Sequence, residues 1–97
     1  MENCNCHKTK VRSAEDVRRL VNRLARIEGQ IRGLRGMIEA DAYCPDLLTQ
    51  VSATRAALDA FGREVLANHI RTCVTEDIRE GKDETVDELL DVLRKMM

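Results

Sequence analysis

The fold is decided by residues 44–79, which read CPDLLTQVSATRAALDAFGREVLANHIRTCVTEDIR. The only proline of the chain lies at the start of this stretch, and no Gly-rich cluster interrupts it before Gly81. Because proline is favoured at the first position of a helix, the pattern predicts one long helix over residues 45–79 that begins beside Cys44. Its apolar stripe consists of Leu48, Val51, Leu58, Phe61 and Val65.

Two further helices are predicted on either side of this stretch. Ser13 is a candidate N-cap for a helix over residues 13–41, and a third, shorter helix follows Gly81. No strand pattern and no repeat is found, and residues 1–12 lack apolar periodicity, which predicts a flexible N-terminal tail before a helical domain over residues 13–97. The apolar positions are Leu20, Leu24, Ile27, Ile31, Leu34 and Ile38 in the first helix, and Val86, Leu89, Leu90, Leu93 and Met96 in the third.

Size and composition limit the chain to one small all-α domain. It has 97 residues, which leaves no room for a second large core, and its only aromatic residues are Tyr43 and Phe61. Leu, Ile, Val, Ala and Met must therefore form the core, as in a helical bundle. Since elongated helices of this size bury little surface, we expect the chain to self-associate.

The cysteines point to metal or redox chemistry in the cytoplasm. The polar first 13 residues are not a secretory signal, and no apolar run approaches the roughly 20 residues that span a bilayer. We therefore expect a cytoplasmic protein without a membrane segment. Thiols are kept reduced there, so metal binding or redox activity is favoured over structural disulfides for Cys4, Cys6, Cys44 and Cys73.

His69 and Cys73 are four residues apart, so on a helix their side chains share one face within reach of one ion. Considered alone, the pair fits two interpretations equally well: two metal ligands, or a histidine at an interface and a cysteine that is a small buried apolar residue. Cys44 changes this balance, because two thiolates and one imidazole suit trigonal copper(I) better than zinc, which usually takes a fourth ligand. On one continuous helix Cys44 lies about 37 Å from His69. The spacing therefore predicts an antiparallel dimer with two metal sites, each shared between protomers.

The N-terminal tail carries a second group of possible ligands. Cys4, Cys6 and His7 form a CxCH cluster that is either an auxiliary metal site or part of a disordered tail. A fourth ligand from this cluster would complete the coordination that zinc usually takes.

Basic charge is concentrated near the N-terminus, although the net charge is −1. Residues 1–38 contain nine Lys or Arg against four Asp or Glu. Arginines that include Arg19, Arg23 and Arg26 form a stripe on the first helix, which together with Arg63 is suited to DNA phosphates or is simply solvated. No helix-turn-helix signature is apparent. The chain has neither a Gly-rich phosphate loop nor a nucleophile–base pair outside the three candidate ligands, so an enzyme is not expected.

Several segments together resemble the copper-sensing operon repressor (CsoR/RcnR-like) family of metal-responsive transcriptional repressors. The resemblance covers about residues 16–94. It rests on Asn22-Arg23-Leu24, Arg26-Ile27-Glu28-Gly29-Gln30, Asp41-Ala42-Tyr43-Cys44, Gln50-Val51-Ser52-Ala53, and His69 and Cys73 at the family's Cys-x24-His-x3-Cys spacing.

The resemblance implies an antiparallel helix-hairpin dimer that forms a four-helix bundle and assembles into a dimer-of-dimers tetramer. It implies a repressor that binds double-stranded operator DNA when metal-free and releases it on copper(I) binding. The implied metal ligands are Cys44, His69 and Cys73. The implied accessory residues are Tyr43 and Glu88, which link His69 to the third helix, and Arg23 and Arg63, which contact DNA.

Our hypothesis is that copper(I) binding biases the oligomer toward a shape whose arginines no longer fit DNA, a negative coupling of about 5 kcal/mol. One alternative is a thiol- or persulfide-responsive repressor of the same family, in which Cys44 and Cys73 of neighbouring protomers become bridged. Another is a copper-buffering protein that uses the tail thiols and does not bind DNA.

Overall fold

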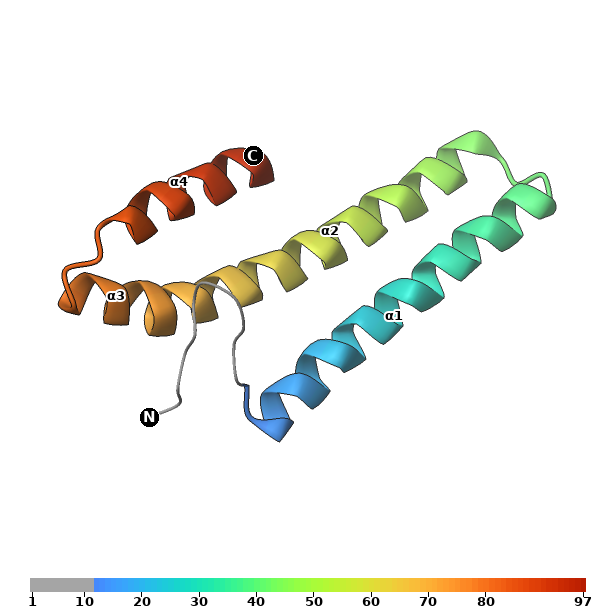
Figure 1. The fold of residues 1–97 in the computed structure, drawn as a ribbon. Helices are drawn as coiled ribbons and strands as arrows, with labels where there is room; N and C mark the ends of the chain where they lie inside the picture. Colours follow the sequence, from blue (N-terminus) through green and yellow to red (C-terminus); the bar gives the residue numbers. More distant parts are fainter. Residues whose placement is uncertain (1–11) are drawn as a thin grey trace. The chain divides into compact units, whose positions relative to one another are not determined.

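The computed structural model describes residues 12–97, which form three helical segments and no strand (Figure 1). The first segment is α1 (Ala14–Glu39). The second runs without a break through α2 (Cys44–His69), the π-helical turn η1 (Ile70–Val74) and α3 (Thr75–Arg79), and the third is α4 (Glu84–Met96). The all-α prediction and its three helical segments are confirmed. Residues 12–65 and residues 66–97 form two separate compact units.

The ends of α1 follow local capping chemistry. The Ser13 hydroxyl accepts a hydrogen bond from the backbone N–H of Asp16 at 3.1 Å, which confirms Ser13 as the N-cap. At the other end, Ala42 N–H donates to the Met37 carbonyl at 2.9 Å, while Asp41 adopts a positive φ of 55°. This is a Schellman ending, in which aspartate takes the left-handed position that glycine usually occupies. It ends α1 at Glu39, two residues earlier than the sequence predicts.

The first unit is a hairpin in which α1 and the adjoining part of α2 lie side by side and antiparallel (Figure 1). The apolar stripe predicted for the first helix divides into two rows. Leu20 and Ile27 are buried and Leu34 is half-buried, whereas Leu24, Ile31 and Ile38 are exposed. The exposed apolar row is formed by Val17, Val21, Leu24, Ile31 and Ile38 of α1 and by Leu48, Val51 and Leu58 of α2.

The long helix departs from α geometry near its end. The sequence predicts an uninterrupted α-helix to residue 79, but residues Ile70–Val74 form a π-helical turn. Two threonine hydroxyls donate to backbone carbonyls there: Thr72 to Asn68 at 2.8 Å and Thr75 to Ile70 at 2.8 Å. The backbone N–H of Thr75 also donates to Ile70, the i→i+5 bond of a π turn. Hydroxyl bonds of this kind compete with the regular backbone pattern and deform helices.

The second unit is organised around Asp77. Its backbone carbonyl accepts from Lys82 N–H at 2.8 Å, and Gly81, with φ of 80°, ends α3 in a second Schellman motif. Its carboxylate accepts a hydrogen bond of 2.5 Å from the Thr85 hydroxyl at the start of α4. Both residues are buried, with 6% of Asp77 and 2% of Thr85 exposed. One residue therefore fixes both the end of α3 and the start of α4.

Replacing Thr85 with valine is expected to lower the free energy of unfolding by about 1–3 kcal/mol, because the variant keeps the side-chain shape but leaves a buried carboxylate without its hydroxyl donor. Urea unfolding followed by circular dichroism measures the change. Thr49→Val is the matched control, because the Thr49 hydroxyl donates to a carbonyl on an exposed part of α2. Equal effects of the two substitutions would contradict the structural role given to the Asp77–Thr85 pair.

Candidate metal centre and basic cleft

Cys44 is the first residue of α2, is exposed and carries a free thiol. The helix starts one residue earlier than predicted, so Pro45 takes its second position, where the missing N–H would have had no partner within the helix. The backbone carbonyl of Tyr43 accepts the N–H of Leu47 at 3.1 Å and closes the first turn. The thiol is thus held at a fixed point of the backbone and is accessible to a partner.

His69 and Cys73 lie on either side of the change in helix geometry. His69 is the half-buried last residue of α2, and Cys73 lies within η1 with 1% of its surface exposed. In the wider π turn, side chains that are separated by four or five positions in the sequence lie near one another along the helix. The Cys73 sulfur is disulfide-bonded, whereas the sequence favours a reduced thiol at this position. Metal binding through Cys73 therefore requires the disulfide to be reduced.

The residues present fit a soft metal ion by donor type. Two thiolates and one imidazole are the ligands that thiophilic ions such as copper(I) prefer. Within residues 12–97 of one chain, no three His, Cys, Asp or Glu side chains gather closely enough to hold an ion. The two ends of α2 carry Cys44 and His69, and a helix of 26 residues is about 39 Å long. The shared site between protomers remains a prediction.

The accessory residues and the tail are not tested by the geometry. Tyr43 is 72% exposed and Glu88 is exposed on α4, and neither forms a side-chain hydrogen bond or ion pair in the described part of the chain. The CxCH cluster of Cys4, Cys6 and His7 lies outside the described residues. The roles of these five residues stay predictions.

The arginines of the hairpin are organised by one carboxylate that the sequence reasoning did not single out. Glu64 of α2 receives Arg19 at 3.4 Å on one oxygen and Arg23 at 3.3 Å on the other. Its Oε2 is buried and forms this ion pair without accepting a hydrogen bond. Arg26 and Arg63 are exposed and form no ion pair among residues 12–97. Of the four arginines predicted to contact DNA, Arg19 and Arg23 are therefore paired and Arg26 and Arg63 are not.

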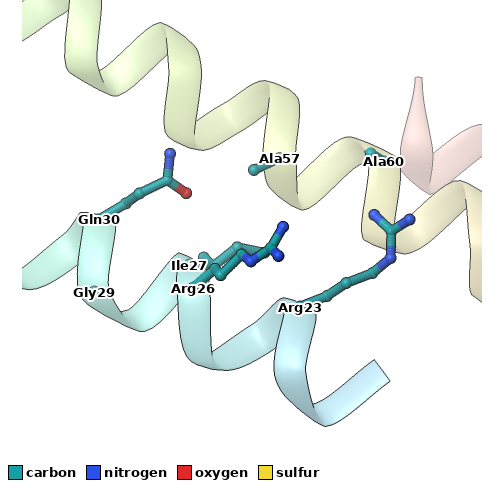
Figure 2. Close-up of a pocket in the computed structure, with 7 residues that line it drawn as sticks. All are labelled: Arg23, Arg26, Ile27, Gly29, Gln30, Ala57 and Ala60. Carbon is teal, nitrogen blue, oxygen red and sulfur yellow. The ribbon is translucent and has the colours of Figure 1, made fainter. Parts of the chain in front are cut away.

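A cleft of about 580 Å³ opens between α1 and α2 beside these arginines. Figure 2 shows the guanidinium groups of Arg23 and Arg26 and the amide of Gln30 directed from α1 toward α2. Ala57 and Ala60 face them from α2, where small side chains leave the space open. We call this feature the basic cleft, and it is lined by Arg23, Arg26, Ile27, Gly29, Gln30, Ala57 and Ala60. Sequence reasoning missed Gln30 and the two alanines, because their meeting depends on how the two helices pair.

Among residues 12–97 no helix is both long enough and apolar enough to cross a membrane.

Comparison with known proteins identifies the family. The model of the metal-sensitive transcriptional repressor family matches residues 16–95. The chain is 43% identical over 97 residues to the copper-sensing transcriptional repressor CsoR of Bacillus subtilis, with 98% of this chain and 96% of the relative covered.

Solved structures agree with this assignment. The copper-sensing repressor CsoR with Cu(I) from Geobacillus thermodenitrificans is similar with a TM-score of 0.85 and 42% identity, covering 90% of this chain and 92% of the other. The nickel-responsive transcriptional regulator InrS is similar with a TM-score of 0.73 and 38% identity, covering 94% of this chain and 100% of the other. The chain belongs to the metal-sensitive transcriptional repressor family.

Proposed function

We propose that this protein is a copper(I)-responsive repressor that binds operator DNA when metal-free and releases it when copper(I) binds. The observation that carries the proposal is the donor set on Cys44 and His69 at the two ends of α2 and on Cys73 in η1, which is two thiols and one imidazole once the disulfide of Cys73 is reduced. The similarity to copper-sensing repressors over almost the whole chain supports the same assignment.

In the proposed site, Cys44 of one protomer and His69 and Cys73 of its partner bind one copper(I) ion. An ion held this way draws two protomers together at a point that neither reaches alone. The exposed apolar row supports such an arrangement, because Ile31 is 50% exposed although it belongs to the same stripe as the buried Ile27. A second hairpin packed on this row would complete a four-helix bundle. Further pairing of two dimers would give the tetramer.

Operator binding is proposed to use the arginines of the hairpin, Arg19, Arg23, Arg26 and Arg63. Their guanidinium groups lie at the ends of long side chains, and a dimer carries each of them twice. This arrangement suits contacts with the phosphates of double-stranded DNA. Tyr43 and Glu88 are proposed to connect the metal site with α4. A cytoplasmic setting, where thiols stay reduced, is part of the same proposal.

Titration of copper(I) into the operator complex at fixed salt tests the proposal. Because occupancy must change from nearly full to nearly empty, the two DNA-binding states must differ in copper(I) binding by about 5 kcal/mol. Fluorescence anisotropy of a labelled operator duplex under anaerobic, reducing conditions is expected to fall to the value of free DNA. Persistence of the complex at saturating copper(I) would rule the proposal out. Nickel(II) serves as the comparison ion, since a stronger response to nickel(II) than to copper(I) would indicate a nickel-responsive regulator instead.

A second candidate function, a thiol-responsive repressor in which Cys44 and Cys73 of neighbouring protomers become bridged, is favoured by the exposed free thiol of Cys44. In that case oxidation or persulfide transfer, rather than metal binding, would release DNA, and His69 would not be needed. The His69→Ala variant separates the two functions. A thiol sensor keeps its response to oxidant in this variant, whereas a copper(I) sensor loses its response to the metal.

A further inference from the structure

Cys73 is the candidate ligand whose state differs from the one that copper(I) binding needs. Its sulfur is disulfide-bonded and lies in η1 with 1% of the residue exposed. The Thr72 hydroxyl donates a hydrogen bond of 3.6 Å to the same sulfur. The thiolate is the form of cysteine that binds a metal ion, and a disulfide sulfur is not a thiolate. The disulfide and the proposed copper(I) site therefore exclude each other at this atom.

The partner of Cys73 follows from the cysteines of the chain. The sequence contains four cysteines, Cys4, Cys6, Cys44 and Cys73. The bond is formed within one chain, and Cys44 of that chain carries a free thiol. The second sulfur must therefore belong to the CxCH cluster, which lies outside the described residues.

We infer that Cys73 forms its disulfide with Cys4 or Cys6, and that this bond switches off the copper(I) site under oxidising conditions. The inference rests on the proposed function for the role of Cys73 as a metal ligand, whereas the bond itself depends on neither metal nor DNA. Where thiols are kept reduced, a disulfide is usually transient and serves catalysis or redox sensing. The CxCH cluster thereby acquires a role other than metal binding.

The bond forms through two thiol–disulfide exchanges with a low-molecular-weight disulfide such as glutathione disulfide. In the first exchange, a cysteine thiolate of the cluster attacks the oxidant, so that a mixed disulfide forms and one glutathione thiolate leaves. In the second, the Cys73 thiolate attacks the cysteine sulfur of the mixed disulfide and releases the other glutathione. The two protein thiols lose two electrons and two protons, which the two released glutathione molecules gain. Excess glutathione reverses both steps and restores the Cys73 thiol.

This switch acts in the opposite sense to a thiol-responsive repressor. In such a repressor oxidation itself releases DNA. The bond of Cys73 lies outside residues 12–65, the compact unit that carries all four arginines proposed to contact DNA. The oxidised chain is therefore expected to bind the operator and to remain bound when copper(I) is added.

Peptide mapping of the full-length protein tests the identity of the bond. The reduced protein is equilibrated with glutathione disulfide, alkylated with iodoacetamide and digested with trypsin without reduction. Cleavage after lysine and arginine places the cysteines on three separate peptides, residues 1–8 with Cys4 and Cys6, residues 36–55 with Cys44, and residues 72–79 with Cys73.

The expected product is peptide 1–8 joined to peptide 72–79, from a protein that migrates as a monomer in non-reducing electrophoresis. The Cys44→Ala variant is the matched control and is expected to give the same joined peptides. A bond between peptides 36–55 and 72–79, a covalent dimer, or an unlinked peptide 72–79 would overturn the inference.

The double variant Cys4→Ser/Cys6→Ser tests the effect of the bond on the metal site. Competition with a copper(I) chelator under anaerobic conditions gives the copper(I) affinity of the reduced and of the oxidant-treated protein. Treatment is expected to lower the affinity of the wild type by more than about 100-fold, as loss of a ligand does, and to leave that of the double variant unchanged. Because each protein is compared with itself, any direct contribution of the cluster to copper(I) binding cancels. An equal loss in both proteins would overturn the inference.

Failure of the proposed function gives a different result from failure of this inference. Persistence of the operator complex of the reduced wild type at saturating copper(I) would refute the proposed function, and the joined peptides would still establish the bond. Release of the operator by copper(I) from the reduced protein, without joined peptides after oxidation, would refute this inference alone.

Discussion

Replacing Cys44 with alanine is expected to abolish release of the operator by copper(I) while leaving the metal-free complex unchanged. Cys44 is exposed at the first position of α2, so its removal disturbs no packing of the hairpin. The proposed site then keeps only one thiolate and one imidazole. Loss of a residue that merely orients a ligand lowers metal affinity by about 10–100-fold, so loss of a ligand is expected to lower copper(I) affinity by more than about 100-fold.

Two measurements together give a decisive result for this variant. Competition with a copper(I) chelator measures metal affinity, and anisotropy of the labelled operator measures DNA binding with and without metal. Ser52→Ala is the matched control, because Ser52 is an exposed residue of α2 that is not among the proposed or possible metal ligands. Release of the operator from the Cys44→Ala variant at the copper(I) concentration that acts on the wild type would eliminate Cys44 as a ligand.

Most of the fold was predictable because its signals are local. Ser13 caps α1 through a hydrogen bond within one turn, and a single proline followed by residues without further breaks predicts a helical segment that reaches residue 79. The ends of α1 and α3 are also local, since Asp41 and Gly81 take the left-handed conformation. The predicted boundaries are accordingly within two or three residues of those observed.

The rest required three-dimensional information. The π turn at Ile70–Val74 coincides with hydroxyl bonds from Thr72 and Thr75 to backbone carbonyls, which the helical pattern of the sequence does not reveal. The stripe predicted from Leu20 to Ile38 is continuous in sequence, but only Leu20 and Ile27 are buried in one chain. The basic cleft and the role of Glu64 depend on which residues of α2 face α1. The contacts between α1 and α2 cannot be predicted from the spacing of residues within either helix.

The candidate ligands were recognised from spacing and donor chemistry, but spacing cannot bring them together. Cys44 and His69 are the first and last residues of the 26-residue helix α2, and no three candidate ligand side chains gather within residues 12–97 of one chain. The sequence therefore predicts both the site and its dependence on a second protomer. An experiment that tests this dependence must distinguish a site whose ligands all come from one chain from a site whose ligands come from two chains.

Mixing two inactive variants is expected to restore copper(I) binding. Cys44→Ala chains retain His69 and Cys73, and Cys73→Ala chains retain Cys44. After equimolar unfolding and refolding, a complete site forms wherever Cys44 comes from a Cys73→Ala chain and the other two ligands come from a Cys44→Ala chain. Random assortment gives this combination at about one quarter of all sites, since each of two independent choices is correct half of the time.

The measurement is the amount of copper(I) bound tightly per chain in the presence of a competing chelator. Wild type refolded in the same way sets the full value, and each variant refolded alone sets the background. Recovery near one quarter of the wild-type value, together with partial copper(I)-dependent release of the operator, is the expected result. A site made within a single chain would recover nothing, because every chain in the mixture lacks one ligand. The mixture therefore tests the sharing of the site directly, independently of whether two or four chains assemble.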